Sequence, residues 1–341
     1  MKLVTIDCGT TNSRVYVVDE GGVVIARASK RVGVKDTAIQ GSNRLLKDAL
    51  KELIDEALEE AGLLPSDVRC ILSSGMISSE LGLFVIPHLW APCPLSSLAD
   101  NLSRVRCDEV FPEGVPVYIV PGIKNPYDAG SVSMRDVEGL DFMRGEEAQI
   151  AGLLAEEAEG RPTLVTILSS HTKFVPVDEK QTILGSVTTL SGQLYDALLK
   201  ETFVGKSVRR EDDFDDGAYF SAAVVEAAAR CVQESGFLRS LMFPRFLDTL
   251  VHTPWYDRRL FTESLFAAED LRAFSRIRGV VDLSRARVVF VGSERRCRIY
   301  EHLLRASHDI IGAATVVSEE GEIDRLSIRG VLYLAKRAGV I

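Results

Sequence analysis

The first twenty residues constrain the fold more than any other stretch of the chain. An apolar run over residues 3–6 ends at Asp7, a turn with Gly9 follows, and the apolar character resumes at Val15. This pattern predicts a strand, a tight turn and a second strand. Gly9 lets the backbone approach an anion closely, and the N–H groups and hydroxyls of such a turn can hydrogen-bond phosphate oxygens.

The side chains of this turn suit phosphate and metal binding. Asp7 can hold Mg²⁺ directly or through water. The residues that would contact phosphate or sugar are Gly9, Thr10, Thr11 and Asn12. The turn resembles the first phosphate-binding loop of the actin, hexokinase and Hsp70 class of ATP-using proteins. The alternative is an ordinary hairpin turn that Asp7 caps.

The next hundred residues extend this start. A glycine turn at 19–22 and a strand over 23–28 predict a three-stranded antiparallel meander. An amphipathic helix follows, with Ser42 as its N-cap and Gly62 as its C-cap. A buried strand over 68–72 comes next. A Rossmann half would place a helix directly after the first strand, so this order favours half of an ASKHA (actin, Hsp70 and sugar kinase) fold.

Composition narrows the class of protein. The chain has 341 residues, enough for roughly two domains of ~150 residues each. The net charge of −9 argues against nucleic acid or an anionic membrane as the main partner. No apolar stretch approaches ~20 residues, and a strand starting at Leu3 is expected to leave no room for a signal peptide. Six scattered cysteines without a C-x-x-C pair predict reduced thiols and a cytoplasmic protein.

The Gly/Pro/Asp-rich stretch at 121–139 is the best domain boundary. We therefore expect an N-terminal lobe over residues 1–140 and a C-terminal lobe over 141–341, with the last helix packing back on the first lobe. Residues 163–177 repeat the opening pattern of strand, small polar turn and strand. A strand over 288–291 then leads through Gly292 and Ser293 into a helix, as in an adenosine-binding turn; a generic strand–helix connection is the alternative.

Five short blocks carry a more specific resemblance: residues 7–14, 74–76, 143–149, 171–173 and 190–195. In order and spacing they resemble the 2-dehydro-3-deoxygalactonokinase family of sugar-acid kinases. The resemblance implies an α/β, two-lobed ASKHA (ribonuclease H-like) fold with central mixed sheets and the ligand cleft between the lobes. It also implies a kinase that uses ATP and Mg²⁺ to phosphorylate 2-dehydro-3-deoxy-D-galactonate at O6 in galactonate and galactose catabolism. The sequence leaves open whether the chain forms a homodimer.

The block at 143–149 holds the candidate general base. Glu146 and Glu147 stand at the start of a predicted helix, where related sugar kinases place a catalytic carboxylate, and analogy favours Glu146. Both glutamates could instead only complement the helix N-terminus. Arg144 could pair with the substrate carboxylate, or form a surface ion pair. The other candidate substrate residues, at the end of a strand, are Ser74, Gly75 and Met76.

The second hairpin carries the other candidate phosphate contacts: Ser169, Ser170, His171 and Lys173. In the family this turn reads Pro-Gly-Thr-His, so Ser169 stands where the family has glycine. A Cβ at that position could crowd the phosphates or force a positive φ. We expect a loop displaced outward and weak ATP binding; an unstrained Ser169 with ordinary binding is the alternative. This departure leaves two other functions open: a non-catalytic or altered-specificity ASKHA sugar-acid or nucleotide-binding protein, and an ASKHA phosphohydrolase.

Overall fold

The computed structural model describes residues 2–155, 160–275, 279–307 and 314–341. Their contacts divide the chain into two compact units. The first unit contains Met1–Gly160, Lys180–Gly185 and Gly321–Ile341, and the second contains Arg161–Glu179 and Ser186–Glu320. Residues 141–160 and the C-terminal segment therefore group with the N-terminal part of the chain. The lobe boundary at residue 140 stays a prediction.

The first unit is built on a six-stranded mixed sheet in the order β3-β2-β1-β4-β8-β7. The meander of β1, β2 and β3 is antiparallel, β4 and β8 run parallel to β1, and β7 is antiparallel to β8. The strands are β1 (Lys2–Cys8), β2 (Ser13–Asp19), β3 (Val24–Lys30), β4 (Val68–Gly75), β7 (Ser103–Val105) and β8 (Val117–Ile119). The predicted meander and the predicted buried strand after it are confirmed.

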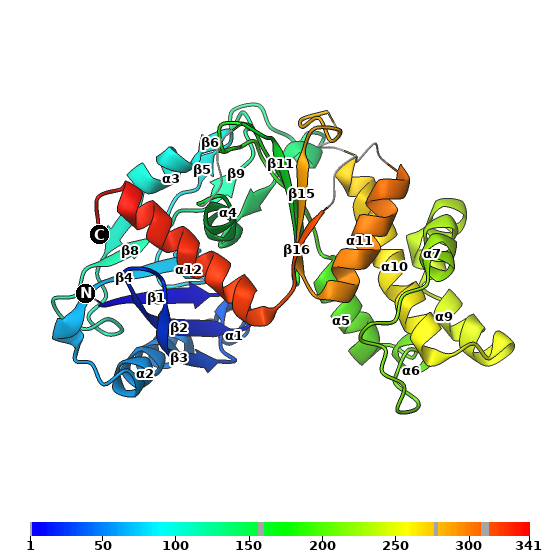
Figure 1. Cartoon of the computed structure of the whole chain (residues 1–341), viewed down its shortest axis with the longest axis horizontal. Coiled ribbons are helices and arrows are strands. Elements are labelled where there is room, and N and C mark those ends of the chain that lie inside the picture. The colour runs from blue at the N-terminus through cyan, green and yellow to red at the C-terminus, as the bar shows by residue number, and fades with distance from the viewer. Residues whose placement is uncertain (1, 156–159, 276–278, 308–313) are drawn as a thin grey trace. The chain divides into compact units, whose positions relative to one another are not determined.

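Helix α2 (Arg44–Glu60) covers the meander, as Figure 1 shows. Its apolar residues recur every three or four positions and are buried, which makes one continuous apolar stripe. The predicted N-cap is wrong: the helix begins after Asn43, whose side-chain amide donates to the carbonyl oxygen of Gly82 at 3.2 Å. Gly62 follows the last turn with φ +66°, the left-handed conformation that suits glycine there.

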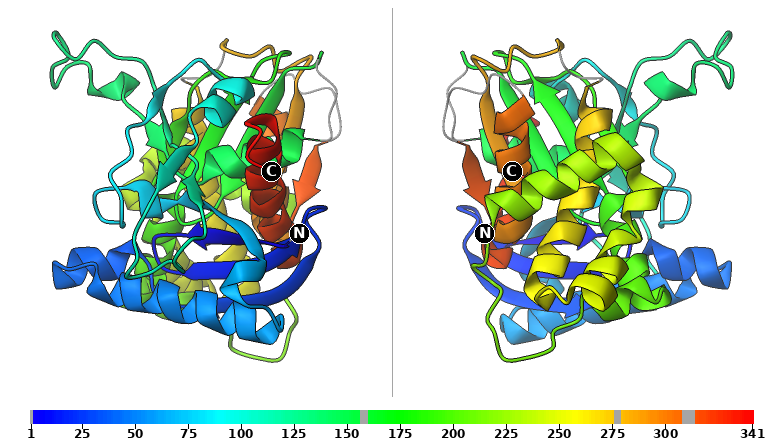
Figure 2. Two further views of the ribbon diagram at one scale, coloured as in Figure 1. Left: turned by 90° about the vertical axis from the view of Figure 1, so that its left-hand side faces the viewer. Right: turned by 90° about the vertical axis from the view of Figure 1, so that its right-hand side faces the viewer.

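The rest of the first unit consists of short strands, 3₁₀ turns and further helices. A three-stranded sheet has the order β10-β9-β5, and β6 pairs with β13. These strands are β5 (Leu89–Trp90), β6 (Cys93–Pro94), β9 (Ile123–Lys124), β10 (Phe142–Met143) and β13 (Thr182–Ile183). The helices are α1 (Val34–Gln40), α3 (Leu95–Asp100), α4 (Glu146–Leu154), α12 (Glu320–Arg337) and the 3₁₀ turns η1 (Pro65–Asp67), η2 (Met76–Ser78) and η3 (Val137–Gly139). The segment between β9 and β10 extends outward in both views of Figure 2.

The second unit has its own mixed sheet. In it β11 pairs with antiparallel β12 and parallel β15, β14 pairs with β12, and β16 pairs with β15. The strands are β11 (Thr163–Leu168), β12 (Thr172–Val177), β14 (Val187–Thr189), β15 (Arg287–Gly292) and β16 (Thr315–Val317). The second hairpin and the strand before Gly292 were both predicted and are confirmed.

Helices fill most of the second unit between β14 and β15, as expected from the sequence. They are α5 (Ser191–Glu201), α6 (Val204–Ser207), α7 (Ala222–Ser235), α8 (Phe237–Ser240), α9 (Phe243–Phe246), the π-helical turn η4 (Leu247–Val251), α10 (Trp255–Phe274) and, after β15, α11 (Glu294–Ser307). A core around Phe174, Phe274 and Phe290 joins the sheet to α10 and α11.

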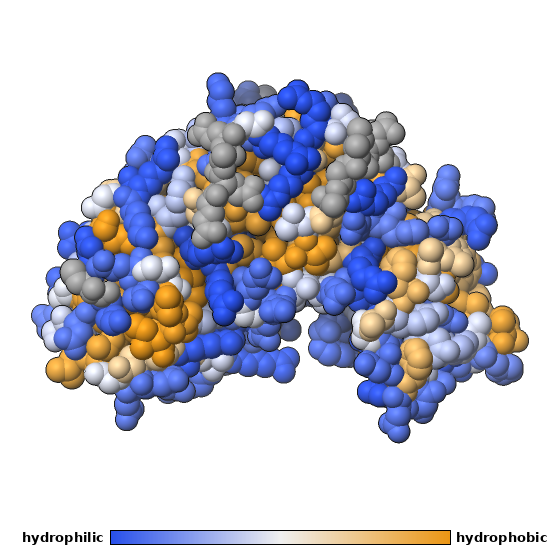
Figure 3. Space-filling view, in the orientation of Figure 1, coloured by the Kyte–Doolittle hydropathy of each residue, from blue (hydrophilic) through white to orange (hydrophobic). Residues whose placement is uncertain are grey.

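Both units expose mixed surfaces. Hydrophilic and apolar side chains lie side by side on the face of each unit that Figure 3 shows. Within the described part of the chain, every helix is too short or too polar to cross a membrane.

Candidate active site

The carboxyl ends of β1 and β4 lie next to each other at one edge of the first unit's sheet. In their parallel register Asp7 is opposite Ser74, and Cys8 is opposite Gly75. Gly75 has φ +91°, and a Cβ there would lie 2.5 Å from the carbonyl oxygen of Cys8. A Cβ on Gly145 would lie 3.3 Å from the Cα of Gly75. The segment before α4 thus reaches the strand ends, the place where α/β proteins gather their ligand sites.

The first turn, residues 9–12, is held by its own hydrogen bond and by the backbone of Gly33. The N–H of Gly9 donates to the carbonyl oxygen of Asn12 at 2.8 Å, which closes the turn. Gly33 precedes α1, and a Cβ there would lie 2.5 Å from the carbonyl oxygen of Thr10. Because the backbone of Gly33 packs directly against the turn, the turn has little room to shift. The side chains of Thr11 and Asn12 are exposed, as phosphate-binding groups must be.

Asp7 lies among charged groups of the first unit. Its Oδ2 is 3.4 Å from Nη1 of Arg14, and the Nε of Arg14 is 3.8 Å from Oδ1 of Asp324 on α12. Burial raises the pKa of Asp7 from its ordinary value; Arg14 opposes this, and the negative charges of Asp324 and Glu146 add to it. The structure therefore brings three carboxylates into electrostatic contact, one each from β1, α4 and α12.

These carboxylates fit a magnesium ion at Asp7. The side chain of Asp7 is 27% exposed, so its oxygens are accessible. Its carboxylate neighbours make the site electronegative, which favours a divalent cation. No group of three or more His, Cys, Asp or Glu side chains within the described ranges could by itself hold a metal. Magnesium commonly takes one or two protein carboxylates and completes its shell with water and substrate phosphates, and Asp7 can serve in that way.

Glu146 and Glu147 are neighbours in sequence with opposite environments. Glu146 is partly exposed, and its Oε2 accepts the N–H of Arg144 at 3.1 Å. Glu147 is 0% exposed, and its Oε1 accepts the N–H of Gly145 at 2.8 Å. Burial, followed by the charge of Glu146, raises the pKa of Glu147 to about 8. Glu147 is therefore mainly protonated at neutral pH and inaccessible to a substrate, whereas Glu146 is accessible.

Arg144 holds the chain around this site. Its Nη1 donates to Oγ of Ser78 at 2.6 Å, and its Nη2 donates to the carbonyl oxygen of Ile86 at 2.6 Å and lies 3.2 Å from Nδ1 of His88. Burial lowers the pKa of the guanidinium. These contacts fasten Arg144 to the segment after β4. Its expected role, pairing with the substrate carboxylate, stays a prediction.

The second turn, residues 169–171, is unstrained at Ser169. Among the described residues, positive φ values outside glycine occur at Gln181 and His252. The predicted strain at Ser169 is therefore wrong. The Oγ of Ser169 donates to the carbonyl oxygen of His171 at 2.9 Å, which closes the turn through a side chain. Because that bond needs no left-handed backbone, the turn accepts serine where the family has glycine.

Two residues outside the turn fix its backbone. Nη1 of Arg296 on α11 donates to the carbonyl oxygens of Leu168 at 3.1 Å and Ser169 at 3.0 Å. Gly192 packs so closely that a Cβ there would lie 2.1 Å from the carbonyl oxygen of Ser169. The hydroxyl of Ser170 lies 3.5 Å from Nδ1 of His171. Ser169 and Ser170 are the exposed residues of the turn.

The remaining predicted phosphate and nucleotide residues belong to the same sheet. Lys173 is 6% exposed, and its Nζ donates to Oγ1 of Thr188 at 2.8 Å. Gly292 has φ +153°, and a Cβ there would lie 2.8 Å from the carbonyl oxygen of Leu168. Ser293 follows at the start of α11 and is exposed. The structure therefore brings the turn and Gly292–Ser293 together, while Lys173 points its ammonium group into the sheet.

Four residues of these two regions escaped sequence reasoning: Arg14, Gly192, Arg296 and Asp324. A signal existed for two of them, since Arg14 ends the first motif block and Gly192 lies within the block at 190–195. Arg296 and Asp324 lie on helices outside every motif block, and nothing in the sequence ties Arg296 to the second turn or Asp324 to Arg14.

Comparison with known proteins agrees with this geometry. The family model described as 2-keto-3-deoxy-galactonokinase matches residues 7–322. A probable 2-dehydro-3-deoxygalactonokinase of Rhizobium meliloti (strain 1021) is 26% identical over 247 residues, which cover 72% of this chain and 71% of that protein. The 2-dehydro-3-deoxygalactonokinase of Escherichia coli (strain K12) is 26% identical over 215 residues, 63% of this chain and 62% of that protein.

Solved structures show the fold. A crystal structure of a Sinorhizobium meliloti protein that carries the same kinase name superposes with a TM-score of 0.72 at 22% identity, covering 98% of this chain and 96% of that one. Component A of the (R)-2-hydroxyglutaryl-CoA dehydratase of Acidaminococcus fermentans follows with a TM-score of 0.52 at 11% identity, covering 99% of both chains. The predicted ASKHA fold is confirmed. The chain belongs to the 2-keto-3-deoxy-galactonokinase family and is a kinase.

Proposed function

We propose that this kinase transfers the γ-phosphoryl group of ATP to O6 of 2-dehydro-3-deoxy-D-galactonate, in galactonate and galactose catabolism. Family membership supports the reaction class. One structural observation carries the assignment of the chemistry: Glu146 is partly exposed and close enough to Asp7 to raise its pKa, whereas its neighbour Glu147 is fully buried. A carboxylate beside a potential metal ligand is what phosphoryl transfer to an alcohol requires.

Glu146 would act as the general base. Its carboxylate would orient the O6 hydroxyl and accept its proton as the bond to phosphorus forms. The position at the first residue of α4 favours a carboxylate through the helix dipole. Glu147 would stay protonated and support the N-terminus of α4 through its bond to Gly145.

The other residues would bind and orient the substrates. When bound at Asp7, Mg²⁺ would neutralise charge on the phosphates. Gly9 and residues 10–12 would contact phosphate, as would Ser169, Ser170 and His171. Lys173 would add positive charge behind the second turn, and Gly292 and Ser293 would hold the adenosine. Residues 74–76 and Arg144 would recognise the sugar acid.

The cysteine thiols support the proposed cytoplasmic location. All six cysteines are free. Burial raises the pKa of Cys8 and Cys297 to about 12, so these thiols stay protonated and unreactive. Free cysteines suit a reducing compartment, which supports a cytoplasmic location.

An acceptor screen tests the proposed substrate. Purified protein, ATP and Mg²⁺ are mixed in turn with 2-keto-3-deoxy sugar acids, other sugar acids and common hexoses, and ADP release is followed. We expect kcat/KM for 2-dehydro-3-deoxy-D-galactonate to exceed that for any hexose by ~10²-fold or more, since a hexose lacks the carboxylate that the site would pair. A hexose phosphorylated equally well would contradict the sugar-acid assignment.

A further inference from the structure

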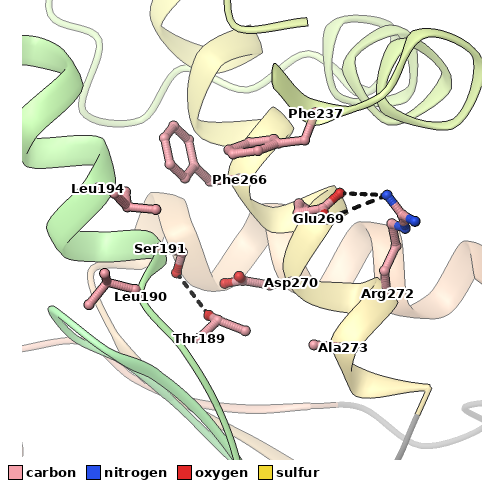
Figure 4. Close-up of a pocket in the computed structure, with 10 residues that line it drawn as sticks. All are labelled: Thr189, Leu190, Ser191, Leu194, Phe237, Phe266, Glu269, Asp270, Arg272 and Ala273. Atoms are coloured by element: carbon pink, nitrogen blue, oxygen red, sulfur yellow. Dashed lines mark hydrogen bonds and ion pairs between the residues drawn. The ribbon is translucent and has the colours of Figure 1, made fainter. Parts of the chain in front are cut away.

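A pocket of about 380 Å³ lies in the second unit between the start of α5 and the C-terminal half of α10. Figure 4 shows its polar floor, which is formed by Thr189, Ser191 and Asp270, with the aromatic rings of Phe237 and Phe266 on one side. Nothing in the proposed mechanism uses the buried carboxylate on this floor. The partners of Asp270 show what it does.

Asp270 is 3% exposed and collects hydroxyl groups from four elements. It accepts a hydrogen bond from Tyr300 on α11, and the hydroxyls of Thr172 on β12, Thr189 on β14 and Ser191 on α5 lie close enough to lower its pKa. Burial raises its pKa, and these four hydroxyls oppose that rise. Thr172 and Thr189 also bond to Ser191, so Asp270 belongs to a connected network of hydroxyls. Such a buried network restrains the positions of the groups that belong to it.

Two of these four neighbours, Thr172 and Ser191, adjoin the second turn. Thr172 follows the turn as the first residue of β12, and its Oγ1 also accepts Nη2 of Arg296 at 3.2 Å. The Oγ of Ser191 lies 2.7 Å from Oγ1 of Thr172. Ser191 also precedes Gly192, the residue that packs against the carbonyl oxygen of Ser169. The second turn is therefore held from both sides by groups that lie around Asp270.

We propose that Asp270 is a positioning residue for the phosphate-binding turn at 169–171: through Thr172 and Ser191 it keeps the turn's backbone in the arrangement that binds ATP. The carboxylate itself touches neither the turn nor the substrate. The inference about ATP rests on the proposed function, whereas the inference about the order of the turn does not. An amide at this position offers one acceptor oxygen in place of two and adds N–H groups that face hydroxyl donors.

The test compares Asp270→Asn with Glu269→Gln, a matched change at the adjacent residue. Glu269 also lines the pocket, but its carboxylate pairs at 3.0 Å with Arg272 at the surface. Hydrogen–deuterium exchange is measured for residues 168–173 and, as an internal reference, for residues 288–291 of β15. We expect exchange at 168–173 to accelerate by ~10-fold or more in Asp270→Asn, with β15 and the Glu269→Gln variant unchanged, because a bond to a charged acceptor is lost beside the turn.

Calorimetry of ATP binding to the same variants gives the second readout. We expect Asp270→Asn to weaken ATP binding by ~10-fold or more, and Glu269→Gln to leave it within ~2-fold of wild type. Equal acceleration of exchange in the turn and in β15 would overturn the proposal, since Asp270 would then support the unit as a whole. Exchange at 168–173 in Asp270→Asn that is as slow as in the wild type would also overturn the proposal.

Ser191→Ala keeps the test decisive where Asp270→Asn does not fold. It removes one hydroxyl between Asp270 and the turn, and it should accelerate exchange at 168–173 in the same selective way. If no sugar acid is phosphorylated by the wild type, the proposed function fails, yet the exchange comparison still decides the role of Asp270.

Discussion

The backbones of α4 and α12 touch at Gly152 and Gly330. A Cβ on Gly330 would lie 1.8 Å from the carbonyl oxygen of Ala148, and one on Gly152 would lie 1.9 Å from that of Leu326. Helices usually pack with their axes 8–10 Å apart, and only glycine permits so close an approach. Since α4 begins at Glu146 and α12 carries Asp324, this contact sets the positions of both carboxylates that act on Asp7.

Replacing Gly330 by alanine should force these helices apart. We expect Gly330→Ala to lower the free energy of unfolding by about 3 kcal/mol, the upper end of ordinary overpacking costs, because the contact is with backbone atoms. The control is Gly321→Ala in the same helix, where a Cβ would meet nothing within 4 Å. It should be neutral or stabilising by up to ~1 kcal/mol. Denaturant unfolding of both variants checks this, and equal stabilities would contradict the close contact.

Substitutions of Glu146 and Glu147 should affect kcat to different extents. Glu146→Gln should lower kcat by ~10²–10⁴-fold with little change in ATP affinity, as expected for loss of a general base. Glu147→Gln should keep kcat within about tenfold of wild type, because an amide replaces a carboxyl group that is already neutral. Steady-state kinetics measure both. A larger loss of kcat in Glu147→Gln than in Glu146→Gln would reverse the assignment.

Glu147 should also make stability depend on pH. Its pKa is about 8 in the folded protein against an ordinary value of 4.5. Between these values the folded protein keeps a proton that the unfolded chain has released, so Glu147 lowers stability as pH rises, by at most ~1.4 kcal/mol per pH unit. Glu147→Gln should therefore gain stability relative to wild type from pH 5 to pH 8 and hold that gain above pH 8. Stability curves that run parallel over this range would show that Glu147 is ionised when buried.

Asp7→Asn keeps the shape of the first turn and removes the charge proposed to hold Mg²⁺. We expect kcat to fall by at least ~10²-fold, since metal-assisted charge neutralisation contributes several kcal/mol. Stability should change little, because the pair with Arg14 is partly exposed. Asp48→Asn, an exposed change on α2, is the control. Wild-type kcat together with an unchanged Mg²⁺ dependence in Asp7→Asn would restrict Asp7 to a structural role.

Ser169→Gly tests whether the unusual second turn weakens ATP binding. The sequence alone predicted relief of strain and tighter binding. With no positive φ at Ser169 to relieve, and with its hydroxyl closing the turn, we expect affinity to stay within ~3-fold or to weaken. Calorimetry decides it. Tighter binding by about 1 kcal/mol or more would restore the steric interpretation.

The hairpins were predictable because their signals are local. The apolar runs and the glycine turns predict β1 to β3, and the repeat of that pattern predicts β11 and β12. The N-cap of α2 was missed because Asn43 uses its side chain on Gly82, which lies 39 residues away in sequence.

The site was predictable only in part, because some of its contacts join residues that are distant in sequence. The motif blocks pointed to Asp7 and to the glutamate pair, but not to which glutamate is buried. That depends on how α4 packs in the folded unit, and its close contact with α12 involves Gly330, far along the chain. The hydroxyls around Asp270 come from four elements spread over more than a hundred residues. No local sequence pattern predicts contacts between residues so far apart in the chain.

The most direct test of the proposed function is the structure of the reaction product. Wild-type protein, ATP, Mg²⁺ and 2-dehydro-3-deoxy-D-galactonate are incubated together, and the product is examined by phosphorus-31 NMR correlated to the sugar protons. The proposal predicts one new phosphate ester coupled to the two protons on C6, and its loss in Glu146→Gln. Phosphate on another carbon, or ATP hydrolysis without any sugar phosphate, would contradict it.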